Sequence, residues 1–543
     1  MKKLIAILLS VLVLLTTFVG CKGVTNDNTD SAGNQVTDKS KILDISVWNS
    51  GYGIKWVDAI KAAYMEDHPG VAINITPHAD SSDFVNTIGL NSASANATDL
   101  YFNYAPDYLK YTDKLVKFND LLESKMTPNE TKTLAEKFGE ETLSALVDKN
   151  GDYYALTYGG GTSGIVYNEK LFKQFDLTRE DGSLFIPRTT QELEDLTRLI
   201  RETTDYKGTG NDIRAKAPIM HYPGYWQSAA IVWWLQYAGT EEFSRFFKFE
   251  GLSGAELNDS MQSVYQQEGM KVGLEALYSI ITKEGVTYKQ SNDVSTGAFA
   301  RKQYLFFIDE VALMYPCGSW LETEMEKTDG FDMSVFNNFS VMKYPVVSTI
   351  VNKLSNPDVG EVGLCELIDY VDAIVAGKTD VEKPEWATDE DVEKIKFARN
   401  CTTGQTASST VCIPSYSESI DLAKDFLKFM YSDEGLKIYA ETQHYFRSVD
   451  FDSEEVKNSI DTSTWSTYSK ANYAISKDNI NVPQNLNHPI RYRGGAREVF
   501  ITAQPEKQFT LAEGAMTVDE FLNNEWKKLK DNWKGQYYQY VNN

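Results

Sequence analysis

Residues 42–76 read ILDISVWNSGYGIKWVDAIKAAYMEDHPGVAINIT, and this stretch decides the fold. Branched apolar residues occupy every second position from Leu43 to Val47, the period of a β-strand. Apolar residues then recur at helical spacing over 56–64, and the HPG at 68–70 ends that helix. Residues 71–75 alternate again. Strand, helix and strand in this order predict a βαβ unit within a parallel sheet that helices cover.

The same alternation of strands and helices continues along the chain. Residues 99–102 (DLYF) and 164–168 (GIVYN) are predicted strands, and the second leads directly into a helix. Thr189 and Glu192 have the spacing of a capping box at the start of an amphipathic helix. Apolar residues over 423–431 share one helical face. We therefore predict an α/β protein up to about residue 440, followed by a more polar tail rich in Tyr and Trp.

The first 41 residues are typical of an exported protein. Two lysines precede an apolar run over 4–19, which is shorter than the roughly 20 residues that span a bilayer, so residues 1–20 are predicted to be a signal peptide. The run ends in FVGC, which resembles a bacterial lipobox and implies lipidation of Cys21. An ordinary secretory peptide with a chance cysteine is the alternative. Residues 21–41 are polar and without periodicity, and they predict a disordered tether.

Composition excludes some partners. The chain has 53 Lys and Arg against 77 Asp and Glu, a net charge of −24. Nucleic-acid binding requires neutralisation of phosphates by basic residues, and docking on anionic lipid has the same requirement. We therefore expect no nucleic acid, and contact with the membrane only through the lipid anchor.

Cysteine and histidine spacing indicates neither a metal site nor a cofactor. No CxxC pair occurs, and the five histidines are scattered. A disulfide such as Cys401–Cys412 and free buried thiols at Cys317, Cys365, Cys401 and Cys412 remain alternatives.

Several stretches follow one another in the order of a known family. They are 47–49 (VWN), 68–71 (HPGV), 99–102 (DLYF), 164–172 (GIVYNEKLF), 187–193 (PRTTQEL), 298–299 (AF), 311–320 (VALMYPCGSW) and 422–435 (LAKDFLKFMYSDEG). In this succession the chain resembles the extracellular solute-binding lipoproteins of ABC sugar importers, the group that includes maltose-binding protein. Extra sequence around 240–295, around 355–405 and after 445 falls outside the resemblance.

The resemblance implies a type II periplasmic-binding-protein-like fold, in which two hinge-linked α/β lobes enclose a ligand cleft. The first lobe would comprise residues 42–157 plus 345–430, and the second residues 158–344 plus 431–543. The glycines that follow Tyr158 would form one hinge crossing.

Carbohydrate recognition requires flat rings against the sugar faces and paired polar groups for the hydroxyls. Trp320 follows an apolar strand and a Gly-Ser turn, at the strand edge where ligands of open α/β sheets gather. Tyr225 and Trp226 lie in an aromatic loop, and Trp233 follows on a helix. We predict that all four contact the ligand. The alternative for each tryptophan is core packing.

Polar residues that follow the first strands predict a second rim of the cleft. They are Asn49 and Tyr52 after the first strand, Asp80 after the second and Asn103 after the third, although Asp and Ser in loops are more often turn-formers. Tyr158 at the hinge and Arg447 complete the predicted ligand-binding set. Arg447 could bind a ligand through its forked guanidinium, or form an ordinary surface ion pair.

These expectations describe a non-enzymatic monomer. It would sit lipid-anchored on the extracytoplasmic face of the bacterial cell membrane, close on a carbohydrate (an oligosaccharide) and deliver it to the permease subunits of an ABC importer. Two alternatives remain. One is a surface glycoside hydrolase or lyase, although no catalytic motif marks an active site. The other is the same fold with a non-sugar cargo such as a peptide or a phosphate ester.

Overall fold

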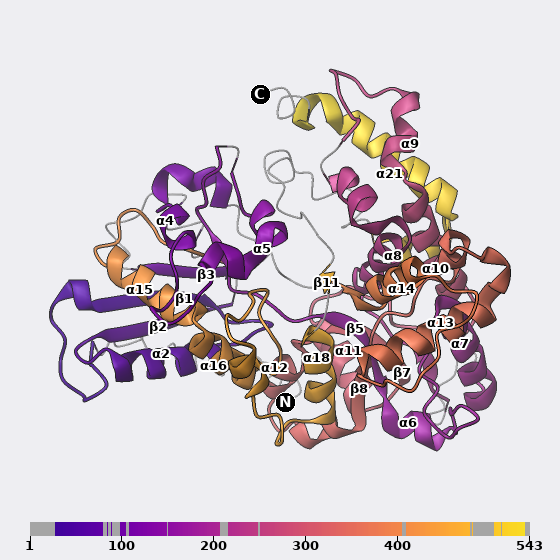
Figure 1. Cartoon of the computed structure of the whole chain (residues 1–543), viewed down its shortest axis with the longest axis horizontal. Helices are drawn as coiled ribbons and strands as arrows, with labels where there is room; N and C mark the ends of the chain where they lie inside the picture. Colours follow the sequence, from indigo (N-terminus) through magenta and orange to yellow (C-terminus); the bar gives the residue numbers. More distant parts are fainter. Residues whose placement is uncertain are drawn as a thin grey trace, which may run out of the picture.

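The computed structural model describes residues 28–79, 84, 88, 98–104, 108–148, 150–206, 215–247, 250–403, 409–477, 480–481, 504–511 and 513–537. The predicted signal peptide, Cys21 and Asp80 lie outside the described residues. Figure 1 shows two halves side by side, and each half is built around its own mixed sheet with helices packed against it. The prediction of an α/β protein is confirmed.

The first sheet contains the predicted βαβ unit. Strands β1 (Ile42–Trp48) and β2 (Ala72–His78) are parallel and connected by α2 (Lys55–Asp67), and β3 (Leu100–Tyr104) is parallel to β1 on its other side. The strand order is β2-β1-β3-β10-β4, in which β10 (Ser409–Cys412) is antiparallel to both β3 and β4 (Leu156–Thr157). Helices of this half are α4 (Asn119–Leu122), α5 (Leu134–Ser144), α15 (Ile420–Tyr431), α16 (Asp433–Gln443) and α17 (Glu454–Asn458).

The second sheet has the order β6-β7-β5-β8. Its strands are β5 (Ser163–Asn168), β6 (Ala217–Ile219), β7 (Ala312–Gly318) and β8 (Phe339–Met342), and only β6 and β7 are parallel. Its helices are α6 (Glu169–Gln174), α7 (Thr190–Thr204), α8 (Tyr225–Phe247), α9 (Gln262–Tyr265), α10 (Glu268–Ile281), α11 (Ala298–Phe307), α12 (Leu321–Glu326), α13 (Gly360–Val375), α14 (Asp389–Asn400), α18 (Thr467–Lys477), α20 (Pro505–Phe509) and α21 (Val518–Asn532). The short strands β9 (Cys401–Thr402) and β11 (Ile480–Asn481) pair with each other as a separate two-stranded sheet.

The chain passes between the halves at the predicted glycines. Residues 158–162 connect β4 of the first sheet to β5 of the second. Gly161 has a φ of +79°, and a Cβ at this position would lie only 2.0 Å from Ser319 Oγ. A side chain is therefore excluded both by backbone strain and by space.

The buried cores divide the chain differently from the predicted lobe boundaries. Residues 346–401 pack in the core of the second half, and residues 436–465 pack in the core of the first. The first difference arises because side chains of α8 hydrogen-bond near both ends of the 346–401 segment. Trp233 Nε1 donates to Pro345 O at 2.9 Å, and Gln236 Nε2 donates to Ala398 O at 3.0 Å.

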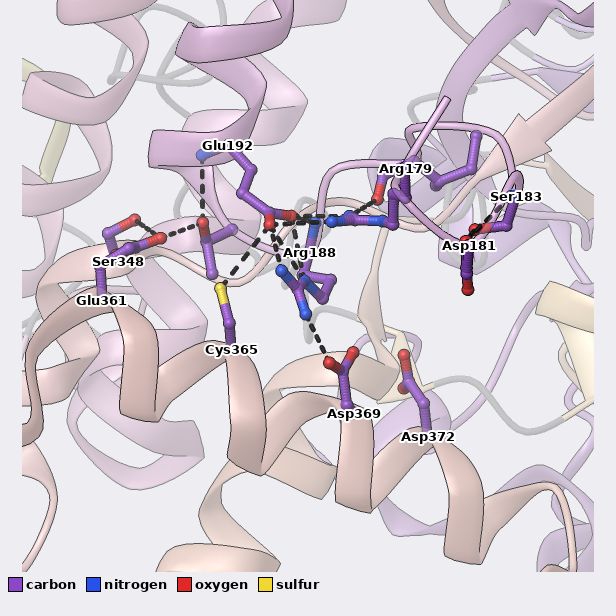
Figure 2. A network of polar contacts seen from close by, with 12 residues as sticks. Arg179, Asp181, Ser183, Arg188, Glu192, Ser348, Glu361, Cys365, Asp369 and Asp372 are labelled. Carbon is purple, nitrogen blue, oxygen red and sulfur yellow. Dashed lines mark hydrogen bonds and ion pairs between the residues drawn. The ribbon is translucent and has the colours of Figure 1, made fainter. Parts of the chain in front are cut away.

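A polar network joins α13 to the start of α7 (Figure 2). Glu192 accepts hydrogen bonds from Arg179 and Arg188, and Arg188 also pairs with Asp369 on α13. Although burial raises the pKa of Glu192, these arginines hold it at about 2. The predicted capping box is half formed, because Glu192 N donates to Thr189 Oγ1 while the Glu192 carboxylate accepts from Arg188 N.

The described part of the predicted tether is ordered. Thr29 forms a β-bridge with Gln35, Val36 packs with Ile42 and Ala72, and Asn74 Nδ2 donates to Asn28 Oδ1 at 2.9 Å. Residues 28–41 therefore fold onto β1 and β2, and the prediction of a disordered tether is wrong for this segment. Val36 is the apolar residue through which this largely polar segment packs against the first half.

Candidate functional site

Four aromatic side chains of the second half lie together where it meets the first. Tyr225 is stacked on Phe299 with ring centroids 5.6 Å apart and planes 9° apart, and Tyr222 meets Phe299 edge-on at 5.3 Å. The ring of Trp320 lies 6.0 Å from that of Tyr225. Tyr222, Tyr225 and Phe299 are half-buried, whereas Trp320 is 6% exposed. Trp320 is thus the most deeply buried of the four. We call Tyr222, Tyr225, Phe299 and Trp320 together the second-lobe shelf.

Two rings of the first half lie at the carboxyl ends of parallel strands. Trp48 ends β1 and Tyr104 ends β3, and their rings are stacked at 4.5 Å with an interplanar angle of 16°. Trp48 is half-buried and Tyr104 is 36% exposed. Adjacent parallel strands bring such terminal residues to one edge of the sheet. We call these two residues the first-lobe ring pair.

The two groups of rings approach each other. A Cβ on Gly51, in the loop after β1, would lie 3.6 Å from Trp320 Cβ and 3.8 Å from the Trp48 ring. Burial raises the pKa of Tyr225 well above its ordinary value, and neighbours that include Tyr104 of the first half raise it further. Trp320 therefore lies at the boundary of the halves. Its contact with a ligand remains a prediction.

A polar pair accompanies the second-lobe shelf. Gln303 on α11 donates from Nε2 to the carboxylate of Glu324 on α12, and Glu324 also adds to the raised pKa of Tyr225. Burial raises the pKa of Glu324 to about 7, and the hydrogen bond from Gln303 only partly offsets it. A carboxyl and an amide beside aromatic rings provide the acceptors and donors that sugar hydroxyls require.

Polar contacts between α12 and the first half link the two halves next to these rings. Lys327 Nζ donates to Ser50 O at 2.8 Å, and Lys55 at the start of α2 pairs with Glu326. His444 Nδ1 lies 3.1 Å from Glu322 Oε2. The last two of these contacts border a polar groove of about 450 Å³ between α2, α12 and α16, which is lined by Lys55, Glu326, Glu322 and His444. We refer to the three contacts as the interlobe clasp.

Three of the predicted ligand residues belong instead to a buried core beside the crossing. Tyr52 and Tyr158 are each 1% exposed, and Tyr52 Oη donates to Gly160 O at 3.1 Å. Arg447 is 5% exposed, and its guanidinium lies over the rings of Tyr439 at 4.0 Å and Trp56 at 4.8 Å. The surface ion pair considered for Arg447 is therefore wrong. Tyr52, Trp56, Tyr158, Tyr439 and Arg447 are named the hinge core below.

The other predicted residues are scattered. Trp226 and Trp233 are fully buried in the core of the second half, where their rings lie 6.3 Å apart, and the structure corrects their placement on the cleft. Asn103 is 3% exposed within β3, which lies between β1 and β10 in the sheet. Asn49 is half-buried, and its backbone N–H donates to His78 O at 2.7 Å.

Sequence reasoning missed six residues of this junction: Trp48, Tyr104, Tyr222, Phe299, Gln303 and Glu324. A signal existed for Trp48, because the alternation that buries Val47 places the next residue on the opposite face, at the end of the strand. Glu324 and Gln303 come together from different helices, and their own sequence surroundings give no indication of this.

Other chemistry is limited in the described residues. Cys317, Cys365, Cys401 and Cys412 are buried thiols that form no disulfide with one another, so the structure favours the thiol alternative over a disulfide. Among the residues with described positions, no three His, Cys, Asp or Glu side chains gather as metal ligands. Within the same residues, no helix combines the length and apolarity needed to cross a bilayer.

Comparison with known proteins identifies the family. Residues 59–458, well over half of the chain, match the family described as "Bacterial extracellular solute-binding protein". The chain belongs to this family. It is a family of binding proteins rather than enzymes, and its members act outside the cell. No curated protein sequence matches the chain.

Solved structures resemble this solute-binding protein in fold. A probable secreted solute-binding lipoprotein from Streptomyces coelicolor superposes with a TM-score of 0.56 at 14% identity, covering 90% of this chain and 99% of the other. A chitin oligosaccharide binding protein gives 0.52 at 14% identity, covering 90% and 98%. Maltose-bound MalE3 of T. maritima gives 0.52 at 12% identity, covering 90% and 99%. The predicted two-lobed type II fold is confirmed.

Proposed function

We propose that this solute-binding protein captures a carbohydrate, specifically an oligosaccharide, between its lobes and delivers it to the permease of an ABC importer. The observation that carries the proposal is that aromatic groups of both halves lie near each other at the lobe boundary. Trp48 and Tyr104 from one half and Tyr222, Tyr225 and Phe299 from the other are the half-exposed rings that can cover the two faces of a sugar. Similar structures that bind a chitin oligosaccharide and maltose support this choice.

The polar groups beside the rings support a polyol as the ligand. Gln303 and Glu324 lie next to the second-lobe shelf and can satisfy hydroxyls that lose water on binding. A ligand that lacks those hydroxyls would leave the remaining hydrogen-bonding capacity of the two groups unused, and this would give the site its specificity. Two stacked positions on the first lobe and a longer shelf on the second provide more ring surface than a single sugar needs, and this favours an oligosaccharide.

Capture would proceed by closure of the lobes about the crossing at residues 158–162. From the cores, we assign the described residues within 42–157 and 409–465 to the first lobe, and those within 163–403 and 466–537 to the second. The interlobe clasp would form in the closed arrangement and break in the open one. Because a ligand shifts this equilibrium only by its differential affinity for the two states, rings from both lobes are required.

The membrane arrangement is part of the same proposal. Lipidation of Cys21 would hold a monomer at the extracytoplasmic face of the cell membrane, beside the permease subunits that receive the sugar. Mass spectrometry of the mature N-terminus tests the anchor. An acylated Cys21 is expected, together with release into the medium on Cys21→Ser. An unmodified N-terminus would contradict it.

Titration calorimetry against an oligosaccharide panel tests the function. We expect saturable binding of one sugar class with one site per chain, together with compaction in solution scattering. Absence of binding across the panel would contradict the proposal. We further propose that the protein does not alter its ligand, so the bound sugar should be recovered unchanged. Released products abolished by an acid-to-amide change would favour a glycoside hydrolase or lyase, and binding of a peptide or a phosphate ester would favour a different cargo.

A further inference from the structure

Two rings of the second-lobe shelf, Tyr222 and Tyr225, lie on either side of the turn that leads into α8. Tyr222 and Tyr225 flank a tight turn in which Tyr225 N donates to Tyr222 O at 3.2 Å, and Gly224 has a φ of +100°. This conformation is free for glycine, but it leaves the Gly224 N–H directed away from the turn and in need of an acceptor. What supplies that acceptor therefore influences where the two rings lie.

The acceptor comes from the C-terminal part of the chain. Glu506 on α20 accepts a hydrogen bond from Gly224 N through Oε1. The same segment contacts the loop's surroundings twice more, because Gln504 N donates to Gln227 Oε1 at 3.2 Å and Asn292 Nδ2 donates to Thr510 Oγ1 at 2.8 Å. Phe509 anchors the segment in the core of the second half. A segment almost 300 residues away in sequence thus backs the ring-bearing loop.

Glu506 is costly for the folded state, which suggests a role beyond stability. It is completely buried, and among the residues that the structure describes its second carboxylate oxygen, Oε2, has no hydrogen-bond partner. Burial raises the pKa of Glu506 to about 7. A buried carboxyl with one unpaired oxygen destabilises a fold, whereas an apolar side chain of similar size would not. Proteins break such local rules mainly at functional sites and compensate for them elsewhere.

A second contact fixes the other side of the loop. Lys302 on α11 is 1% exposed, and its ammonium lies 4.6 Å from the centre of the Tyr222 ring. Its Nζ donates to Ser291 O and Asp293 O. Because these hydrogen bonds fix Lys302, its ammonium restrains the Tyr222 ring, while Glu506 restrains the backbone at Gly224.

We infer that Glu506 is a positioning residue of the ligand site: its carboxylate fixes the Gly224 turn and so pre-sets Tyr222 and Tyr225 for the sugar. This inference rests on the proposed function and extends it to the tail after residue 445, a region outside the resemblance to sugar-importer proteins. Pre-setting rings before the ligand arrives removes part of the ordering cost of binding.

The test uses three variants of the full chain. Glu506→Met keeps the volume and removes the acceptor, Glu506→Gln keeps a carbonyl acceptor, and Glu513→Gln changes an exposed acid on the same tail as a matched control. Amide hydrogen exchange over residues 221–227 is measured without ligand. We expect roughly tenfold or faster exchange in Glu506→Met, as loss of one buried hydrogen bond implies. Glu506→Gln and Glu513→Gln should stay near wild type.

Calorimetry with the sugar identified for the wild type supplies the second readout. The dissociation constant should rise roughly three- to tenfold in Glu506→Met, the cost of ordering one or two side chains on binding, and recover in Glu506→Gln. Exchange in Glu506→Met that is unchanged at 221–227, or that rises equally in β1 and α10, would overturn the inference. So would an unchanged affinity. Failure of the wild type to bind any sugar would instead count against the proposed function, since the exchange measurement does not depend on it.

Discussion

Trp48 and Trp56 lie eight residues apart in the same βαβ stretch, yet they occupy opposite environments. Trp56 is fully buried in the hinge core, stacked on Tyr158 at 5.4 Å. Trp48 is half-buried, stacked on Tyr104 at the open edge of the sheet. The same side chain therefore serves the fold in one place and is available to a ligand in the other. Exposure at a strand end, rather than residue type, separates the two roles.

The largest effect should come from the buried partner. Trp56→Ala leaves a cavity beside the Arg447 guanidinium, and we expect the free energy of unfolding to fall by about 3–5 kcal/mol. Chemical denaturation measures this loss. Trp48→Ala is the matched control and should lose less than about 1 kcal/mol. Equal losses in the two variants would remove the distinction between the hinge core and the ring pair.

The converse pattern is expected for ligand binding. Trp48→Ala removes a ring of the first lobe, and Tyr225→Ala removes a ring of the second. Each should weaken the free energy of sugar binding by about 1–2 kcal/mol, which raises the dissociation constant roughly five- to thirtyfold. Isothermal calorimetry measures the change, with thermal unfolding as a check that the fold persists. If only the Tyr225 variant lost affinity, the first lobe would not contribute a binding face.

Glu324 allows the environment of the second-lobe shelf to be tested through the pH dependence of the free energy of unfolding. Its pKa is raised from an ordinary 4.5 to about 7, so between these values the unfolded chain releases a proton that the folded chain retains. The free energy of unfolding should therefore fall as pH rises from about 4.5 to 7. Glu324→Gln abolishes this contribution. Stability of the variant relative to wild type should rise over that window by on the order of 1 kcal/mol, since the half-buried cleft position weakens the effect. A pH-independent difference would place Glu324 in solvent.

The smallest effect is expected at the interlobe clasp. Lys55 and Glu326 are 65% and 39% exposed, and exposed pairs contribute at most about 1 kcal/mol. Glu326→Gln should weaken sugar binding by no more than roughly fivefold, with a smaller loss at high salt, where the pair is already screened. Calorimetry at two salt concentrations measures this. A loss that is independent of salt would show that Glu326 acts by a route other than the ion pair.

Sequence alone predicted the fold well where local pattern decides it. The alternation over 43–47, the HPG stop and the glycines at 159–161 each specify a local structure, and each was found. The lobe boundaries were less predictable, because α13 and α14 are attached to the second half through Arg188 and Gln236, which are far away in sequence. Which aromatic rings belong to the candidate site depends on their exposure, and exposure is determined by tertiary packing rather than by composition. The strand alternation gave a signal for Trp48, whereas nothing in the sequence around Trp226 showed that its neighbours in space would bury it.

A thermal-shift screen of mono- and oligosaccharides on the wild type and on a Trp48→Ala/Tyr225→Ala double variant tests the central claim most directly. A ligand at a hundredfold excess over its dissociation constant stabilises the native state by about 2.7 kcal/mol. We predict that at least one oligosaccharide raises the melting temperature of the wild type and leaves that of the double variant unchanged. An equal shift in both proteins, or no shift with any saccharide, would contradict a sugar held between the rings of the two lobes.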